Sequence, residues 1–318
     1  MPDQYTVTLT VTDTAGGEMS ATVHAFDALG FEDLNYVPGA DVKDLSVGQD
    51  FLWIGAKDGA YQADLTNPGA GAYPSVNDGY NGDSIATDVR AVHESGGYVW
   101  FGAEQAPGIA YRLDLTANNI LAIALPDPSA KVNDISSGAT GVWCASDKDV
   151  ALSTNLSTFA VGRGDASDAV WEGATGAWSA KDSLFPLPAG DAFQVFTPGN
   201  DKTKGLADDG DLLWLASDAN GVASVSAAGE VQSLYTTADN LSDDKARSIT
   251  VDATGDIWVA TMVGASRFKK DRKVWVPMQD SAGLVSRKDL KAIAIDEQNG
   301  RRAIYVGGSA GLAVMQLP

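Results

Sequence analysis

The chain alternates short apolar runs with polar turns, and one kind of run recurs along its length with an aromatic residue inside it. Gly, Asn or Asp interrupts the pattern every few residues, and no 3.6-residue periodicity is sustained. Runs rich in Val, Ile, Thr and Trp predict β-strands rather than helices. The recurring runs are FLWIGA at Trp53, YVWFGA at Trp100, GVWCAS at Trp143, GAWSAK at Trp178, LLWLAS at Trp214, DIWVAT at Trp258 and AIYVGG at Tyr305.

One unit shows the anatomy of the repeat. Residues 246–268 read ARSITVDATGDIWVATMVGASRF, which predicts three strands joined by two tight turns at Gly255 and Gly264. KVWVPM at residues 273–278 supplies a fourth, outer strand. Four-stranded units with a period of about forty residues are typical of the blades of a β-propeller. The seven units therefore predict an all-β, seven-bladed ring.

The two ends of the repeat array are complementary. The last unit ends after three strands, whereas the strand-like segment GFEDLNYV at residues 30–37 has no blade of its own. We expect this N-terminal strand to complete the C-terminal blade. Such closure removes sheet edges that would otherwise pair with other chains.

The repeat pattern V-x-x-I, D-x-x-G-x-I-W, then G-[VAL], is clearest at Asp252, Gly255, Ile257 and Trp258. It resembles the repeat of two-component-regulator propellers, which are related to streptogramin-lyase-like propellers, over residues 30–318. The resemblance implies an extracytoplasmic sensor or interaction module. It is specific for the fold rather than for one activity, because one fold hosts many functions.

A second resemblance lies at the start of the chain. YTVTLTVTDTAGGEMSATVHAF at residues 5–26 resembles the last two strands of a polycystic-kidney-disease-type (PKD) immunoglobulin-like domain. Two strands alone cannot form a sandwich. We therefore divide the chain into residues 1–26, a remnant of a preceding domain, and residues 27–318, the propeller. Packing of the two strands against the propeller is the alternative.

Composition limits the partners. Lys and Arg total 22 against 42 for Asp and Glu, which gives a net charge of −20. This charge repels nucleic acid and anionic membrane surfaces. No apolar run approaches the length of about 20 residues that spans a bilayer. Together with the neighbouring PKD-like module, these features predict a monomer that is extracellular, on the cell surface or periplasmic.

Catalytic and metal-binding motifs are sparse. The chain has two histidines, His24 and His93, and no zinc-type cluster, Walker loop or nucleophile elbow in a suitable strand–helix context. Streptogramin lyases work with clustered His and Glu, a role for which His93 is the sole candidate. The aspartate-rich stretches could bind calcium but lack the spacing of a twelve-residue calcium loop, so solvated turns are the preferred interpretation and no cofactor is expected. These stretches are NGDS at 81–84, ADDGD at 207–211 and LSDDK at 241–245.

Aligning the units on V-x-x-I reveals one position, two residues before the Ile, that is basic in five units of seven. Because equivalent innermost strands surround the channel, the seven side chains should gather near one end of it. Two interpretations are open: a cationic ring that attracts carboxylates, sulfates or phosphates, and a set of ion pairs that clamp neighbouring blades. The position holds Lys43, Arg90, Asn133, Asp168, Lys204, Arg247 and Lys291.

One step beyond the Ile-type position, most units carry a small residue, whereas His93 and Trp171 do not. These two side chains could form a ring-recognition or sugar-stacking surface, or they could fill space beside the short third and fourth units.

Three functions follow from the sequence. The first is a non-catalytic ligand-binding or sensing propeller for a small anionic molecule or acidic glycan, with Lys43, Arg90, Lys204, Arg247, Lys291, His93 and Trp171 at the site. The second is an extracellular lyase or hydrolase that acts on a polysaccharide or related small molecule. The third is a structural spacer or a scaffold for a protein partner.

Overall fold

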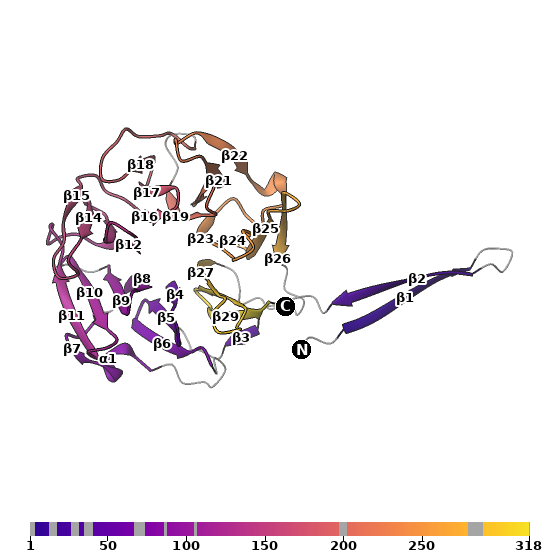
Figure 1. Cartoon of the computed structure of the whole chain (residues 1–318), viewed down its shortest axis with the longest axis horizontal. Coiled ribbons are helices and arrows are strands. Elements are labelled where there is room, and N and C mark those ends of the chain that lie inside the picture. The colour runs from indigo at the N-terminus through magenta and orange to yellow at the C-terminus, as the bar shows by residue number, and fades with distance from the viewer. Residues whose placement is uncertain are drawn as a thin grey trace.

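The chain forms a ring of seven β-sheet blades around a central channel (Figure 1). The computed structural model describes residues 4–12, 18–26, 32–34, 41–66, 74–85, 88–104, 107–196, 202–278 and 289–317. The prediction of an all-β, seven-bladed propeller is confirmed. Each of the seven aromatic repeat positions lies in the second strand of a blade, counted from the channel.

The strands of each blade run from the channel outward in chain order, except that the outermost strands of blades 2 and 7 precede the rest of their blade in the chain. Blade 1 comprises β4 (Val42–Val47), β5 (Phe51–Ala56) and β6 (Gly59–Asp64), and blade 2 comprises β8 (Val89–Ser95), β9 (Tyr98–Ala103), β10 (Ile109–Asp114), β11 (Asn119–Ala124) and the parallel β7 (Asn81–Gly82). Blade 3 comprises β12 (Val132–Ser137), β13 (Val142–Ser146), β14 (Val150–Ser153) and β15 (Ala160–Arg163), and blade 4 comprises β16 (Ala169–Gly173), β17 (Gly176–Ala180) and β18 (Leu184–Pro186).

The remaining blades have four strands each. Blade 5 comprises β19 (Thr203–Asp208), β20 (Leu213–Ser217), β21 (Gly221–Val225) and β22 (Val231–Tyr235), and blade 6 comprises β23 (Ala246–Val251), β24 (Ile257–Thr261), β25 (Ala265–Lys269) and β26 (Val274–Met278). Blade 7 comprises β27 (Leu290–Asp296), β28 (Ala303–Gly308), β29 (Gly311–Gln316) and β3 (Glu32–Leu34). A short α1 (Val76–Gly79) and a 3₁₀ turn η1 (Thr237–Asp239) lie in connections.

The predicted closure by an N-terminal strand is confirmed. β3 pairs antiparallel with β29, Leu34 opposite Leu312 and Glu32 opposite Val314, so the outer strand of blade 7 comes from the start of the chain. The rest of the predicted segment 30–37 lies outside the described residues. Within the described residues, blades 1 and 4 have three strands, and single bridges from Tyr61 to Ser75 and from Leu184 to Phe193 extend them.

The hydrophobic core is divided among the seven interfaces between blades. Each interface holds one cluster of buried apolar side chains, and each cluster contains one repeat aromatic that packs against the following blade. These rings are at most 4% exposed, so each contributes roughly a few kcal/mol of hydrophobic stabilisation. The cluster between blades 3 and 4 is small, with four buried members, consistent with the short third and fourth units.

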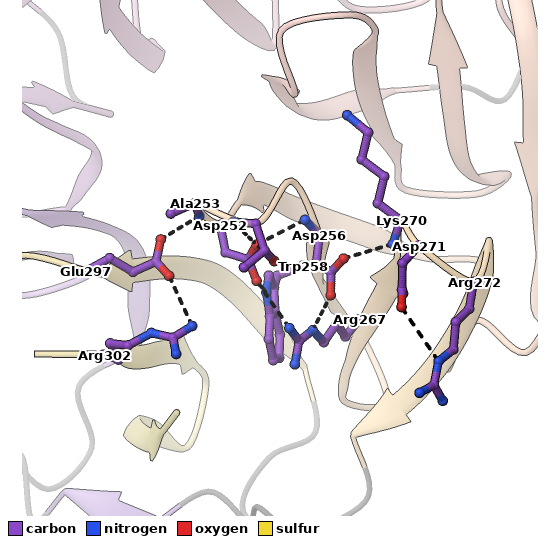
Figure 2. Close-up of polar contacts among 11 residues, drawn as sticks. Asp252, Ala253, Asp256, Trp258, Arg267, Lys270, Asp271, Arg272, Glu297 and Arg302 are labelled. Atoms are coloured by element: carbon purple, nitrogen blue, oxygen red, sulfur yellow. Dashed lines mark hydrogen bonds and ion pairs between the residues drawn. The ribbon is translucent and has the colours of Figure 1, made fainter. Parts of the chain in front are cut away.

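Blade 6 shows the structural role of the aspartate in the repeat motif (Figure 2). Asp252 caps the β23–β24 turn by accepting the backbone N–H groups of Thr254 at 2.9 Å and Asp256 at 3.0 Å. Its other oxygen accepts the indole N–H of Trp258 at 2.9 Å. Arg267 lies 4.7 Å from the centroid of the Trp258 ring and pairs with Asp256 at 2.8 Å. The motif therefore fixes a turn and a core tryptophan with one carboxylate.

The N-terminal segment forms a hairpin of β1 (Gln4–Thr12) and β2 (Glu18–Phe26), which Figure 1 shows outside the ring. The hairpin agrees with the two predicted strands, whereas its origin in a PKD-like domain stays a prediction. The boundary proposed after residue 26 adjoins residues 27–31, outside the described residues. Among the helices of the described ranges, none is long and apolar enough to cross a membrane.

Candidate functional site in the central channel

The innermost strands of the seven blades enclose a cavity of about 570 Å³ on the ring axis. The seven aligned positions from the sequence all line this cavity. The register of the repeat therefore brings together side chains that are far apart in the chain. They are Lys43, Arg90, Asn133, Asp168, Lys204, Arg247 and Lys291.

A β-bulge at the aligned position turns these side chains out of the strand alternation. In blade 1, Val42 pairs with Ala56 and Asp44 with the adjacent Gly55, which leaves Lys43 as an extra residue on β4. The same shift occurs in blades 2, 3, 5, 6 and 7, whereas in blade 4 the strand begins just after Asp168. Bulges re-aim side chains in this way. The bulge explains how a charged residue directly follows a buried one.

Each of the five cations contacts a carboxylate. Three of them reach an adjacent blade, so the interpretation as clamps between blades describes part of their role. The pairs are Lys43 with Asp41 at 2.6 Å, Arg90 with Glu104, Lys204 with Asp168 at 2.9 Å, Arg247 with Asp218 at 3.2 Å and Asp289 at 2.6 Å, and Lys291 with Asp41 at 2.5 Å.

The pairing changes the electrostatics expected from the sequence. Five cations share five carboxylates, so the mouth is not a bare cationic ring, and two of these carboxylates, Asp168 and Asp218, line the cavity themselves. Burial would raise the pKa of Asp41, but the ion pairs with Lys291 and Lys43 outweigh burial and lower it. The five cations are nevertheless not sealed from the channel, because their side chains are 20–38% exposed, Arg90 the most.

Below the charged ring lies an apolar collar. The Ile-type position of every blade lines the same cavity, and each of the seven side chains is 2–7% exposed. These residues also belong to the interfaces between blades. The collar consists of Leu45, Val92, Ile135, Val170, Leu206, Ile249 and Ile293.

Two carboxylates in the channel wall join neighbouring blades. Asp44 accepts the backbone N–H of Val92 at 2.7 Å, and Asp134 accepts that of Val170 at 2.8 Å. Desolvation raises the pKa of Asp44 to about 7. Desolvation and the charge of Asp44 raise the pKa of Asp134 well above its usual range. The alignment of the seven repeat units did not identify these residues, because only two units carry Asp at this position.

His93 and Trp171 both line the cavity, but each has a partner in the protein. His93 Nε2 lies 2.8 Å from Ser137 Oγ, and desolvation lowers the pKa of the imidazole to about 4. The Trp171 indole N–H donates to Asp208 at 3.2 Å, and the half-buried ring packs against the cluster between blades 4 and 5. These contacts accord with space filling, while both rings keep a face on the channel wall.

Carboxylates of the aspartate-rich stretches accept backbone N–H groups of nearby turns and, for Asp83, of strand β11. Asp83 accepts the backbone N–H of Ala122 at 2.7 Å, Asp209 that of Leu212 at 2.8 Å, and Asp244 that of Thr237 at 2.6 Å. Within the described ranges, no group of three or more His, Cys, Asp or Glu residues has a geometry suited to a metal ion. The expectation of no cofactor, with calcium as the alternative, stays a prediction.

Comparisons with solved structures find other propellers. Virginiamycin B lyase from Staphylococcus aureus aligns with a TM-score of 0.71 at 15% identity, over 91% of this chain and 98% of that one. The WD40 β-propeller domain of Doa1 aligns with a TM-score of 0.65 at 15% identity, over 90% and 95% of the two chains.

The extracellular domain of a putative one-component system from B. thetaiotaomicron aligns with a TM-score of 0.50 at 14% identity, over 98% of this chain and 38% of that one. At these identities the likeness is one of fold. No protein-family model matches the chain, and no curated protein matches it. The class of protein is therefore defined by its fold, a seven-bladed β-propeller.

Proposed function

We propose that this chain is a non-catalytic, extracytoplasmic binding or sensing propeller that takes a small ligand with an anionic group at the channel mouth. The channel cavity carries the proposal. Its volume of about 570 Å³ lies in the range of roughly 300–1,000 Å³ common for small-molecule sites, and side chains from all seven blades line it.

Arg90 is the side chain best placed to meet the anion. Its guanidinium pairs with Glu104 through Nη2, while Nη1 makes only a long, 3.5 Å contact with Asn133. The side chain is 38% exposed, so an incoming carboxylate could bind Nη1 in a charge-assisted hydrogen bond. Arg247 offers a second guanidinium, Trp171 and His93 offer ring faces, and point charges come from Lys43, Lys204 and Lys291.

The sensing role and the location outside the cytoplasm draw on a fold relative and on the charge of the chain. One fold relative is the extracellular domain of a putative one-component system, and this chain shares its propeller architecture over 38% of that chain. The strong negative charge agrees with a site that selects against nucleic acid and anionic membranes.

The enzymatic alternative required His93 near a carboxylate at the channel. Among the described residues, the hydrogen-bond partner of its ring is the Ser137 hydroxyl, and the low pKa of about 4 keeps the imidazole neutral near pH 7. A histidine without a carboxylate to orient it is a poor general base. We therefore favour binding over lyase or hydrolase activity.

A thermal-shift titration tests the proposal. Sulfate, an acidic oligosaccharide and its neutral counterpart would be added at fixed low salt, because a ligand that binds only the native state raises its stability. We expect a saturable rise in Tm with the acidic ligands that is lost in Arg90→Gln. The matched control is Arg272→Gln, because Arg272 is 70% exposed and pairs with Asp271 at 3.7 Å outside the channel. Equal binding by Arg90→Gln and the parent would remove Arg90 from the site.

A further inference from the structure

We infer that the ligand of the channel mouth carries both an anionic and a cationic group, as a short zwitterionic peptide does. This inference deepens the proposed function and rests on it. Two features of the channel support it: the balance of charges at the mouth, and two charged groups, Arg90 and Asp218, with spare bonding capacity.

Anionic groups are disfavoured at four of the five cations. Lys43, Lys204, Arg247 and Lys291 each have a carboxylate partner, so an anion that binds one of them competes with that partner and leaves it without a counter-charge. An unpaired charge in a partly buried position is unfavourable. A ligand with both charges can satisfy one cation and one exposed carboxylate of the mouth together.

Two ring members can accept new partners without leaving another charge unpaired. The first is Arg90, whose Nη1 makes only the long contact with Asn133. The second is Asp218, which is 35% exposed and pairs with Arg247. Arg247 is also held by Asp289 at 2.6 Å, so a ligand ammonium that takes Asp218 leaves Arg247 with a counter-ion.

The two groups are on different sides of the mouth. Arg90 belongs to blade 2, and Asp218 follows β20 of blade 5, so they lie three blades apart in a ring of seven. Both line the cavity. A ligand with its carboxylate on Arg90 and its ammonium on Asp218 must therefore span the mouth, which a dipeptide does better than a single sulfate.

Three matched probes test the inference by calorimetric titration at pH 7 with the whole chain. Glycyl-leucine carries both charges, N-acetyl-glycyl-leucine lacks the cation, and glycyl-leucinamide lacks the anion. We expect saturable binding of glycyl-leucine, and at least about tenfold weaker binding of each blocked form, since a charge-assisted hydrogen bond contributes about that factor or more. Equal affinity for glycyl-leucine and its acetylated form would overturn the need for a cation.

Variants assign the two ends of the ligand. Arg90→Gln should reduce affinity for glycyl-leucine about tenfold without changing affinity for glycyl-leucinamide. Asp218→Asn should reduce affinity for glycyl-leucine about tenfold without changing affinity for N-acetyl-glycyl-leucine. Asp271→Asn, on an exposed ion pair, is the control for the second variant.

Binding of sulfate or acidic oligosaccharide without binding of glycyl-leucine would overturn this inference and leave the proposed function intact. Failure of every probe to bind would overturn both.

Discussion

Trp143 and Glu172 join adjacent blades through a hydrogen bond in which the indole N–H donates to Glu172 Oε2 at 2.9 Å. The same connection links Trp53 of blade 1 to Glu94 of blade 2. Glu172 also accepts the Thr140 backbone N–H at 2.8 Å. In these two interfaces, a carboxylate of the following blade satisfies a core tryptophan, whereas in blade 6 the turn residue of the same blade does so.

Replacing Glu172 should weaken this interface. Glu172→Ala leaves the Trp143 indole N–H without an acceptor, which we expect to reduce the free energy of unfolding by about 1–3 kcal/mol. Denaturant unfolding measures the loss. Glu230→Ala, at an exposed position, is the control and should be within about 0.5 kcal/mol of the parent. Equal stability of the two variants would mean that the bond contributes nothing.

Replacing Asp252 should be more damaging, because the residue is 4% exposed and its carboxylate accepts hydrogen bonds from several donors. Asp252→Ala removes the turn cap and leaves both the Trp258 indole and Arg267 without this partner, so we expect a loss of about 3–5 kcal/mol. Thermal unfolding measures this loss, and the control variant is Asp271→Ala, which replaces an exposed aspartate in the same blade. A loss no larger than that of the control would contradict the structural role of the repeat aspartate.

Two truncations separate the hairpin from the closing strand. A chain of residues 27–318 retains β3, and we expect its Tm to stay close to that of the full chain. A chain of residues 41–318 lacks β3, which leaves the β29 edge unpaired, so we expect a lower Tm and self-association detectable by light scattering. A monomeric 41–318 chain with unchanged Tm would show that β3 is dispensable, and a large loss in 27–318 would tie the hairpin to the propeller.

His93 should make the protein less stable as the pH falls. Its pKa is about 4 in the folded chain and about 6.5 when unfolded, so between these values the unfolded state binds more protons and acidification favours unfolding. His93→Gln should therefore lose less stability than the parent between pH 7 and pH 4.5. Asp44 has a pKa of about 7 in the folded chain, so its protonation stabilises the folded state as the pH falls. The quantity to measure is therefore the difference in stability between parent and variant at each pH. Parallel curves would contradict the assignment.

The sequence was sufficient for the blade count, the closing strand and the gathering of one aligned position at the channel. Ion pairs between blades were one of the two interpretations of that position, but the partner carboxylates could not be named, because several come from other strands and loops, as Glu104 and Asp218 do. A signal was nevertheless present: Asp41, Asp88 and Asp289 each stand two residues before a basic aligned residue. An alignment extended upstream would have predicted Asp41 and Asp289 as partners.

The repeated GATG of residues 138–141 and 173–176 also gains a physical basis. A Cβ atom at Gly138 would lie 2.4 Å from Glu172 Cγ, and one at Gly173 would lie 2.2 Å from Asp208 Oδ2. In both places a carboxylate of the following blade crosses the glycine. Sequence alone could show the echo but not its cause, because the crossing side chain comes from the next unit.

The pairing of β3 with β29 has a consequence for synthesis of the chain. β3 leaves the ribosome almost a whole chain length before β29, and at bacterial or eukaryotic elongation rates this interval is on the order of tens of seconds. During that time the innermost and middle strands of the early blades can form, but the ring has no partner for its first strand. Closure of the propeller is thus coupled to synthesis of its last blade, and a nascent chain that stalls within that blade leaves an open sheet edge.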